Sequence, residues 1–275
     1  MEDKKSLVAV IMAVYVNDNI DHVKDALASL YSQYCPVDIY LQKDGFVSPE
    51  LSEFLNDELS MNKINYIGHR DENKGLAFSL NQLLDIVLKK RYKYIARMDA
   101  DDLSDSMRIE KQLQFMDINS SVDLCGTHIK EFSEEYDYEK IVKYPLRHKE
   151  MFDFFRYRVP VAHVSVMFRA DCFSKCGVYP ISGHISNEDM LLWMNAFSSG
   201  CVFANIDYVG VHVRVGDGFF SRRSGLAKVI SDFKNRILVA RKLRFGVKAY
   251  ISALLFVFLS IMPPSIKKFL YLGLR

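Results

Sequence analysis

The sequence predicts an α/β fold with a doubly wound, mainly parallel sheet and a helical C-terminal tail. Strand-like and helix-like segments alternate four times in the first part of the chain, which is the pattern of such a sheet. Segment 7–14 is apolar without a break, as expected of a parallel strand buried on both faces. With 275 residues and 49% apolar content, the chain can bury a full core.

Hydrophobic periodicity and the turn residues between apolar runs predict the individual elements. In the first half we expect strands at 7–14, 37–41, 64–67 and 94–98, and helices at 21–32 (capped by Asp21), 49–59 and 76–89. In the second half we expect helices at 106–116 and 187–198, strands at 122–127, 164–168, 202–205 and 208–213, and a charged surface loop at 131–139. Residues 1–225 then form one domain with halves at 1–103 and 104–225, and residues 226–275 form the tail.

The tail differs from the rest of the chain in charge. From Arg222 to Arg275 there are twelve Lys and Arg against one acid, a net charge of +11, whereas the remainder carries −9. This distribution argues against a nucleic-acid partner, which would require a basic folded domain, and indicates that the tail meets an anionic surface.

An uncharged run of 13 residues, 250–262, lies within this tail. It is shorter than the roughly twenty residues that span a bilayer. One interpretation is a buried core helix. We favour a monotopic contact with anionic lipids at the cytoplasmic face of the inner membrane.

The cysteines indicate a reducing compartment. Cys35, Cys125, Cys172, Cys176 and Cys201 are odd in number and contain no Cys-x-x-Cys pair, so we expect reduced thiols rather than a disulfide or zinc framework. The N-terminal residues have no cleavage pattern, and we expect no signal peptide.

The most informative motif is the run 94–102, in which a short apolar segment leads into three carboxylates. In an extended strand, Asp99 and Asp101 project to the same side. Unpaired carboxylates this close repel each other, and a bound Mg²⁺ or Mn²⁺ would remove that repulsion. The run therefore predicts a divalent-metal and diphosphate site at the carboxyl end of a strand.

Two other interpretations of this run are weaker. A helix start capped by Ser104 or Asp105 leaves the preceding carboxylates unexplained. A calcium-hand loop would place Leu103 at a ligand position and Ser104 where a glycine is needed, so that interpretation fails.

Polar loops follow each of the first four predicted strands, at 13–17, 44–45, 73–75 and 99–102. Loops after parallel strands share one edge of the sheet, which predicts a pocket for a nucleotide diphosphate. The sequence has no Gly-x-Gly-x-x-Gly and no Gly-Lys-Ser/Thr motif, so a metal ion is the natural partner of the diphosphate.

Taken together, the sequence resembles the family-2 glycosyltransferases, whose nucleotide-sugar-binding fold is called GT-A. The resemblance covers about residues 7 to 225, in family order, and closest in kind are bacterial enzymes that build O-antigen, capsule or exopolysaccharide, including the amylovoran type. It is carried by the segments Val10–Tyr15, Gln42–Gly45, Asn73–Ala77, Ala96–Asp102 and Asn187–Trp193.

The resemblance implies roles for residues on the donor side. Asp44 would accept a hydrogen bond from a uracil ring, Tyr15 and the backbone of Ala13 would hold the base, and Lys74 would lie near the nucleoside. Asp99 would contact the ribose or the metal, and Asp101 would ligate the metal. This chain has Ala13 where the family usually has proline, which leaves the contact unchanged because the backbone makes it. It has Gln42-Lys43 where acidic residues are usual, so a weaker uridine preference or a different base is an alternative.

Glu188 and Asp189 match the family motif that carries the catalytic base. A sugar hydroxyl that attacks an anomeric carbon must lose a proton, and a positioned carboxylate can take it. One base suits an inverting displacement with metal assistance. We assign Asp189 as the base and Glu188 as its positioning partner. The acids would also complement the dipole of a helix start.

Other polar residues have two interpretations each. His163 lines the acceptor pocket or is a satisfied core histidine. Arg214, Arg222 and Arg223 lie on a loop that folds over the diphosphate or form a solvated basic face. Trp193 is expected in the core, and His212 is a weak candidate for the metal shell.

The sequence therefore predicts a metal-dependent inverting glycosyltransferase that uses a nucleotide sugar and a lipid-diphosphate-linked saccharide acceptor. The alternatives are a sugar nucleotidyltransferase, which would need a glycine-rich N-terminal loop, and a non-catalytic membrane-peripheral protein that binds nucleotide sugars.

Overall fold

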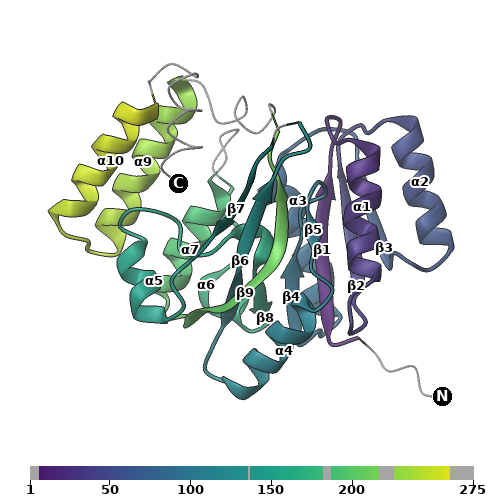
Figure 1. Cartoon of the computed structure of the whole chain (residues 1–275), viewed down its shortest axis with the longest axis horizontal. Helices are drawn as coiled ribbons and strands as arrows, with labels where there is room; N and C mark the ends of the chain where they lie inside the picture. The colour runs from purple at the N-terminus through teal and green to yellow at the C-terminus, as the bar shows by residue number, and fades with distance from the viewer. Residues whose placement is uncertain (1–5, 136, 182–186, 217–225, 261–275) are drawn as a thin grey trace.

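The computed structural model describes residues 6–135, 137–181, 187–216 and 226–260. Its mixed α/β architecture is shown in Figure 1. In chain order the elements are β1 (Val8–Val14), α1 (Ile20–Tyr31), β2 (Asp38–Asp44), α2 (Pro49–Ser60), β3 (Tyr66–Arg70), α3 (Leu76–Lys89), β4 (Tyr94–Arg97), β5 (Leu103–Ser104), α4 (Arg108–Ile118), β6 (Leu124–Phe132), β7 (Glu139–Val142), α5 (His148–Phe154), the 3-10 turn η1 (His163–Ser165), β8 (Met167–Arg169), α6 (Cys172–Cys176), α7 (Glu188–Ser198), β9 (Phe203–Arg214), α9 (Leu226–Lys242) and α10 (Val247–Ser260).

One sheet runs through the molecule in the order β3-β2-β1-β4-β8-β6-β9-β5, with β7 paired to β6. The first four strands pair in parallel. Strand β8 lies antiparallel between β4 and β6, and β9 then runs parallel to β6. The predicted fold class is confirmed, and the carboxyl ends of β1 to β4 share one edge, as expected.

Alternate side chains of β1 pack on opposite faces of the sheet. Ala9 and Ile11 belong to the core that contains α3 and α7. Val10 and Met12 belong to the core that contains α1, α2 and α4. Because both faces of β1 are covered, its uninterrupted apolar run is explained, and the sheet is doubly wound.

Local details differ from the expectations at several boundaries. The cap of α1 is Asn19, whose side chain accepts a hydrogen bond from the Asp21 amide, so Asp21 lies in the first turn instead. No side chain caps α4, although Asp105 Oδ1 accepts from the amide of Met107. Strand β3 begins at Tyr66 rather than at residue 64, since Asn65 is hydrogen-bonded to Ile39 on β2.

The second half holds the larger differences. The expected loop at 131–139 is a hairpin that joins β6 to β7. The two expected strands at 202–205 and 208–213 are one strand, β9, whose pairing with β6 shifts register around His128. A bulge of this kind breaks the hydrophobic alternation without ending the strand. The expected strand at 164–168 is shortened to Met167–Arg169 because the 3-10 turn η1 precedes it.

The final two helices lie side by side at one end of the molecule (Figure 1). Val239, Ala240, Phe245 and Ala249 from this region are buried in the core that contains α3 and α7. Helix α10 buries Ala249 and Ala253 and exposes most of its larger apolar side chains. In the part of the chain that is described, no helix combines the length and apolar character needed to cross a membrane.

Candidate active site

The turn after β4 brings three carboxylates together. Each of Asp99, Asp101 and Asp102 offers an oxygen atom, and these atoms lie within 4.8 Å of one another. Asp102 is buried, and its Oδ1 accepts a hydrogen bond of 2.9 Å from the backbone amide of Arg214. Burial and the charges of Asp101 and Asp99 raise the pKa of Asp102 well above its ordinary value. A set of oxygen donors with this repulsion fits a hard divalent cation such as Mg²⁺ or Mn²⁺.

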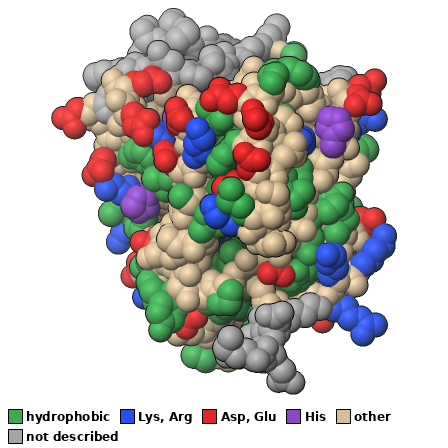
Figure 2. All heavy atoms as spheres, turned by 90° about the vertical axis from the view of Figure 1, so that its right-hand side faces the viewer, with side chains coloured by type: hydrophobic (Ala, Val, Ile, Leu, Met, Phe, Trp, Pro, Cys, Tyr) green, Lys and Arg blue, Asp and Glu red, His purple; other side chains and the backbone are tan. Residues whose placement is uncertain are grey.

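This turn lies at the sheet edge where the parallel strands end. In the space-filling view of Figure 2, acidic side chains gather toward the upper end of the molecule, which is the end at which β1 terminates in Figure 1. An acidic surface by itself repels a diphosphate, so the site needs cations to bind one. The sequence pointed to Asp99 and Asp101 as the residues at the metal, whereas in the structure an oxygen atom of Asp102 converges with theirs.

Arg97, the last residue of β4, neutralises part of this charge. Its side chain is 3% exposed, and Nη1 donates a hydrogen bond of 2.6 Å to Oδ2 of Asp99 while Nη2 contacts Oδ1. Burial disfavours the charged guanidinium, but Asp99 and Asp102 outweigh it and the pKa of Arg97 is raised. The paired contact fixes the orientation of the Asp99 carboxylate.

The first turn of α7 carries the second acidic group. The Asn187 amide donates to Oε2 of Glu188 at 3.1 Å, and the Met190 amide donates to Oδ1 of Asp189 at 2.7 Å. Burial and the neighbouring charge of Asp189 raise the pKa of Glu188. Backbone amides at the start of the helix therefore fix the positions of both carboxylates.

Tyr179 is within electrostatic reach of both acidic groups. Burial is the main cause of its raised pKa, and the charges of Glu188, Asp189 and Asp99 raise it further. Arg97 acts on Glu188 as well as on Asp99. The two groups, predicted from distant parts of the sequence, therefore both act on Tyr179 and on Arg97.

His163 contacts Tyr179. Its Nε2 lies 2.9 Å from the Tyr179 hydroxyl, and its ring meets the Trp193 ring edge-on. Burial and the charge of Arg97 hold the pKa of His163 well below its ordinary value, so the ring is neutral. This environment matches the satisfied core histidine of the two alternatives. Trp193 is fully buried, as expected.

Asp44, predicted to bind the nucleotide base, lies at the end of β2. Oδ1 of Asp44 accepts a hydrogen bond of 3.0 Å from Nε of Arg70 and one of 2.8 Å from the Lys74 amide. Gly45 has φ of +80°, and a Cβ there would lie 2.7 Å from the Asn73 amide nitrogen. A glycine is required here because the loops after β2 and β3 touch.

The other residues predicted to bind the nucleotide lie on the neighbouring loops. Ala13 and Tyr15 are half-buried at the end of β1, and the Tyr15 amide donates to Asp18 at 2.8 Å. The ammonium of Lys74 lies 5.4 Å from the centre of the Phe78 ring, at the solvent side. The four loops expected at one edge are thus found there.

Arg214 ends β9 rather than lying on a free loop, which corrects its expected placement. Its Nε donates to the carbonyl of Asp101 at 3.1 Å, and its guanidinium contacts Glu134 and Asp25. These contacts hold the cation beside the acidic turn. Arg222 and Arg223 lie outside the described residues.

His212 belongs to neither described group of candidate metal ligands. It pairs with Leu103 across β9 and β5, and burial and Lys130 lower its pKa. Its place in the metal shell is therefore not supported.

Comparison with known proteins identifies the family. The family described as Glycosyl transferase family 2 matches residues 9–175. This chain belongs to that family. The amylovoran biosynthesis glycosyltransferase AmsE of Erwinia amylovora is 29% identical over 265 residues, covering 96% of this chain and 97% of AmsE. The UDP-Gal:alpha-D-GlcNAc-diphosphoundecaprenol beta-1,3-galactosyltransferase of Escherichia coli is 25% identical over 280 residues, covering 98% and 97%. The resemblance inferred from the motifs is confirmed.

Two solved structures confirm the GT-A fold. S. aureus TarS in complex with UDP-GlcNAc superposes with a TM-score of 0.66 at 15% identity, covering 91% of this chain and 70% of that one. The mannosyltransferase PcManGT of Pyrobaculum calidifontis, in complex with GDP-Man and Mn²⁺, has a TM-score of 0.59 at 14% identity, covering 96% and 78%. At these identities the likeness establishes the fold of this family-2 chain.

Three residues of the site were not predicted from the sequence: Arg97, Arg70 and Tyr179. Arg97 precedes Asp99 by two positions, so strand alternation would have placed both on one side. Arg70 ends β3 beside Asp44 in the parallel register, and the prediction missed this pairing because it ended the strand three residues earlier, at 67. No sequence signal points to Tyr179, which reaches the site because Asn81 on α3 hydrogen-bonds its backbone.

Proposed function

We propose that this family-2 protein is a metal-dependent inverting hexosyltransferase. It transfers a sugar from a nucleotide-diphosphate sugar, with UDP as the expected nucleotide, to a lipid-diphosphate-linked saccharide in bacterial surface polysaccharide synthesis. The observation that carries the proposal is the pairing of the acidic turn after β4 with the acidic first turn of α7, with Arg97 acting on both. In a displacement reaction, the acidic turn after β4 would bind the metal ion at the leaving diphosphate, and the acids of α7 would accept the proton of the attacking hydroxyl.

Asp189 acts as the base in this proposal. The acceptor hydroxyl oxygen forms a bond to the anomeric carbon, its proton passes to the Asp189 carboxylate, and the bond to the nucleoside diphosphate breaks. Attack opposite to the leaving group inverts the anomeric centre, and one carboxylate suffices. Glu188, whose pKa is raised by burial and by Asp189, orients the acceptor or the base.

Asp99 and Asp101 hold the metal ion, with Asp102 beside them. When bound, Mg²⁺ or Mn²⁺ would neutralise the diphosphate and stabilise the charge of the leaving group. Arg97 keeps Asp99 oriented, and Arg214 stays fixed against the backbone of Asp101. The Mn²⁺ complex of the structural neighbour PcManGT supports this use of the turn.

Asp44 recognises the base, with Ala13, Tyr15 and Lys74 around the nucleoside. Oδ1 of Asp44 is engaged by Arg70 and by the Lys74 amide, which orients the carboxylate. A fixed acceptor selects a base that presents an N–H group, as uracil does. The UDP-GlcNAc complex of TarS supports the nucleotide class.

The acceptor is expected at a membrane surface. The diphosphoundecaprenol in the name of the Escherichia coli relative supports a lipid-linked acceptor. Residues 1–225 would form the transferase domain, and 226–275 the membrane-associating tail. Arg241 and Lys242 at the end of α9, Arg244 in the turn that follows and Lys248 on α10 are exposed. Together with the exposed apolar side chains of α10, this end of the helix pair presents both features that bind anionic lipid.

A transfer assay tests the proposal. Purified protein is incubated with a panel of UDP- and GDP-sugars, a synthetic lipid-diphosphate-linked monosaccharide, and either Mn²⁺ or a chelator. We expect transfer with one UDP-sugar, loss of transfer in chelator, and an inverted anomeric configuration by NMR. Retention of configuration, transfer in the presence of chelator, or formation of a sugar nucleotide instead would each contradict a stated part of the proposal.

A further inference from the structure

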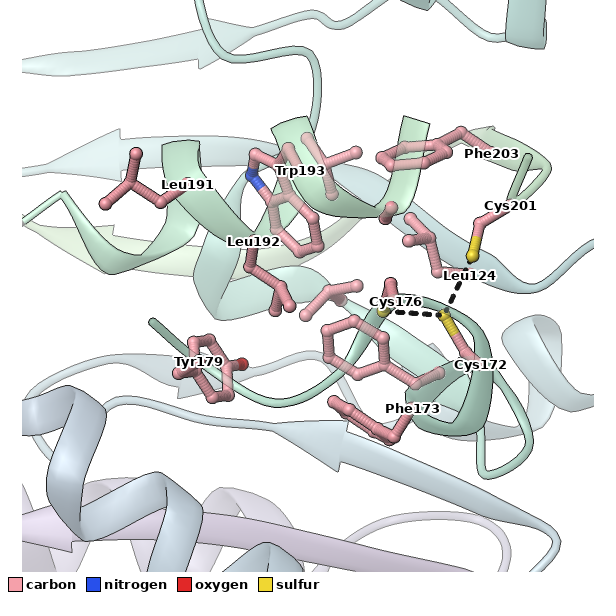
Figure 3. Close-up of a cluster of buried hydrophobic side chains, with 14 of the residues drawn as sticks. Leu124, Cys172, Phe173, Cys176, Tyr179, Leu191, Leu192, Trp193, Cys201 and Phe203 are labelled. Atoms are coloured by element: carbon pink, nitrogen blue, oxygen red, sulfur yellow. Dashed lines mark hydrogen bonds between the residues drawn. The ribbon is translucent and has the colours of Figure 1, made fainter. Parts of the chain in front are cut away.

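Three buried cysteines converge at the end of the sheet opposite the acidic turn. Sγ of Cys172 lies 3.9 Å from Sγ of Cys176 and 3.8 Å from Sγ of Cys201. The three sulfur atoms all lie within 4.8 Å of one another. Figure 3 shows the side chains pointing toward a common centre, between α6 and the segment that leads into β9. All five cysteines of the chain are free. The sequence did not predict this convergence, because it lacks the Cys-x-x-Cys pairs typical of zinc sites.

The local backbone explains why the thiols meet. Positions four apart on a helix share a face, so α6 presents Cys172 and Cys176 together. Gly177 and Gly200 have φ of +77° and +76°, and an added Cβ at either would meet nothing within 4 Å. Their role is conformational: one ends α6 just after Cys176, and the other turns the chain just before Cys201.

We propose that Cys172, Cys176 and Cys201 form a binding site for one thiophilic divalent cation of the zinc class. Zinc–sulfur bonds of about 2.3 Å place sulfur atoms about 3.8 Å apart in a tetrahedral site. The separations of Cys172 Sγ from the other two sulfur atoms match this value without rearrangement. The chain supplies three ligands, and a water molecule completes the fourth position.

The surroundings suit a metal thiolate. Leu124, Phe173 and Phe203 form an apolar shell around the sulfurs (Figure 3). Three thiolates and one divalent cation carry a net charge of −1. The ammonium of Lys175 is within electrostatic reach of Cys201 and Cys172, and it also pairs with Asp123 at 2.7 Å.

Cys176 is the most exposed of the three thiols, at 7%, and its neighbours Ser174 and Lys175 on α6 are exposed. A cation bound here would tie α6 to the start of β9, which are distant in sequence. This inference does not depend on glycosyl transfer. The cysteines lie near the start of β9, whereas Arg214, beside the proposed transferase site, lies at the far end of that strand.

Cobalt and zinc titrations of the reduced, metal-stripped full chain test the site. We expect one Co²⁺ per chain, with a sulfur-to-cobalt charge-transfer band and the absorption of a four-coordinate ion, and displacement by one Zn²⁺. Binding should release protons, since the thiols deprotonate. Cobalt bound by the carboxylates of the acidic turn gives no sulfur-to-cobalt band, so this band distinguishes cobalt bound by the cysteines from cobalt bound there. The band should therefore persist in Asp101→Asn.

Matched serine variants locate the ligands. Cys172→Ser, Cys176→Ser and Cys201→Ser should each weaken binding by at least about tenfold, whereas Cys35→Ser and Cys125→Ser should leave it unchanged. Absence of a charge-transfer band in the reduced wild-type chain would overturn the proposal, and this measurement needs no variant to fold. A band that survives both Cys172→Ser and Cys201→Ser, or that disappears in Cys35→Ser, would overturn it equally.

Discussion

Arg97 contacts the Asp99 carboxylate through both terminal nitrogens of its guanidinium, and its side chain is almost completely buried. The two residues stand on the same side of the chain at the end of β4. Asp99 is half-buried and faces the other carboxylates of the turn. The buried cation therefore sets the orientation of the carboxylate that we assign to the metal site.

We expect Arg97→Lys to lower the transfer rate by roughly a hundredfold, because a small misplacement at a reacting centre costs about that factor. Lysine keeps the charge but cannot form the paired contact. The variant should also need more Mn²⁺ for half-maximal rate, a change that a purely structural role would not produce. Initial rates over a Mn²⁺ series measure both effects, with the exposed Arg91→Lys as control. A variant with wild-type rate and metal dependence would contradict the role of Arg97.

Asp101→Asn should separate activity from stability. Loss of a metal ligand should lower the transfer rate by roughly a hundredfold to a thousandfold. Removal of one of three mutually repelling carboxylates should leave the melting temperature of the metal-free protein equal or higher. Thermal melts and rates of the same preparation provide the comparison. Asp71→Asn, whose side chain is 97% exposed, is the control. A strongly lowered melting temperature would show that Asp101 has a structural role instead.

Asp189→Asn should lower kcat by roughly a hundredfold to ten-thousandfold, the usual contribution of a general base. Binding of UDP should stay unchanged, since the acceptor side alone is altered. Glu188→Gln should lower kcat less. Calorimetric UDP binding together with steady-state kinetics distinguishes these effects. An active Asp189→Asn beside an inactive Glu188→Gln would reverse the two assignments.

The stability of the metal-free protein should fall as the pH rises past the ordinary pKa of Glu188. Burial, and then Asp189, raise this pKa above 4.5, so the folded chain holds the proton after the unfolded chain has released it. The stability from this group is present below the ordinary pKa and is lost as the pH approaches the folded value. Urea unfolding between about pH 4 and about pH 7 should therefore show a smaller loss for Glu188→Gln than for the wild type. Parallel curves for the two proteins would refute this expectation.

The apolar face of α10 should bind lipid vesicles. Leu254 is 61% exposed and Phe258 is 59% exposed. Burial of each side chain in lipid is worth about 1.5–3 kcal/mol. The double change Leu254→Ser and Phe258→Ser should therefore weaken vesicle binding by at least about tenfold. Flotation with phosphatidylglycerol vesicles measures the effect. Ile118→Ser, at a residue 84% exposed on α4, should have no effect. Equal flotation of all three proteins would exclude α10 as the contact.

The first half of the fold was predictable because its signals are local. Helix α3 was predicted with its observed bounds, and the buried run of β1 indicated a parallel sheet before any pairing was known. The polar loops after these strands likewise placed Asp44 and Asp99 at one edge of the sheet. These residues lie next to strand ends or helix starts, where sequence patterns carry most information.

The second half depends on contacts between distant segments. Strand β8 has three residues, and only its place between β4 and β6 makes it a strand. The convergence of Cys201 with Cys172 depends on that same long-range pairing, since nothing in the intervening sequence brings them together. Tyr179 enters the site through hydrogen bonds to Asn81, which lies 98 residues earlier.

The position of β8 determines how the molecule can move. Its backbone pairs with Tyr94–Ala96 on one side and with Leu124–Cys125 on the other, so the parts of the chain before and after the acidic turn share one uninterrupted sheet. A hinge between these parts would have to break interstrand hydrogen bonds in the protein interior, at the cost of unsatisfied buried groups. Closure around a substrate must therefore come from loops and side chains at the sheet edge, while the strands keep the two acidic groups at a constant separation during turnover.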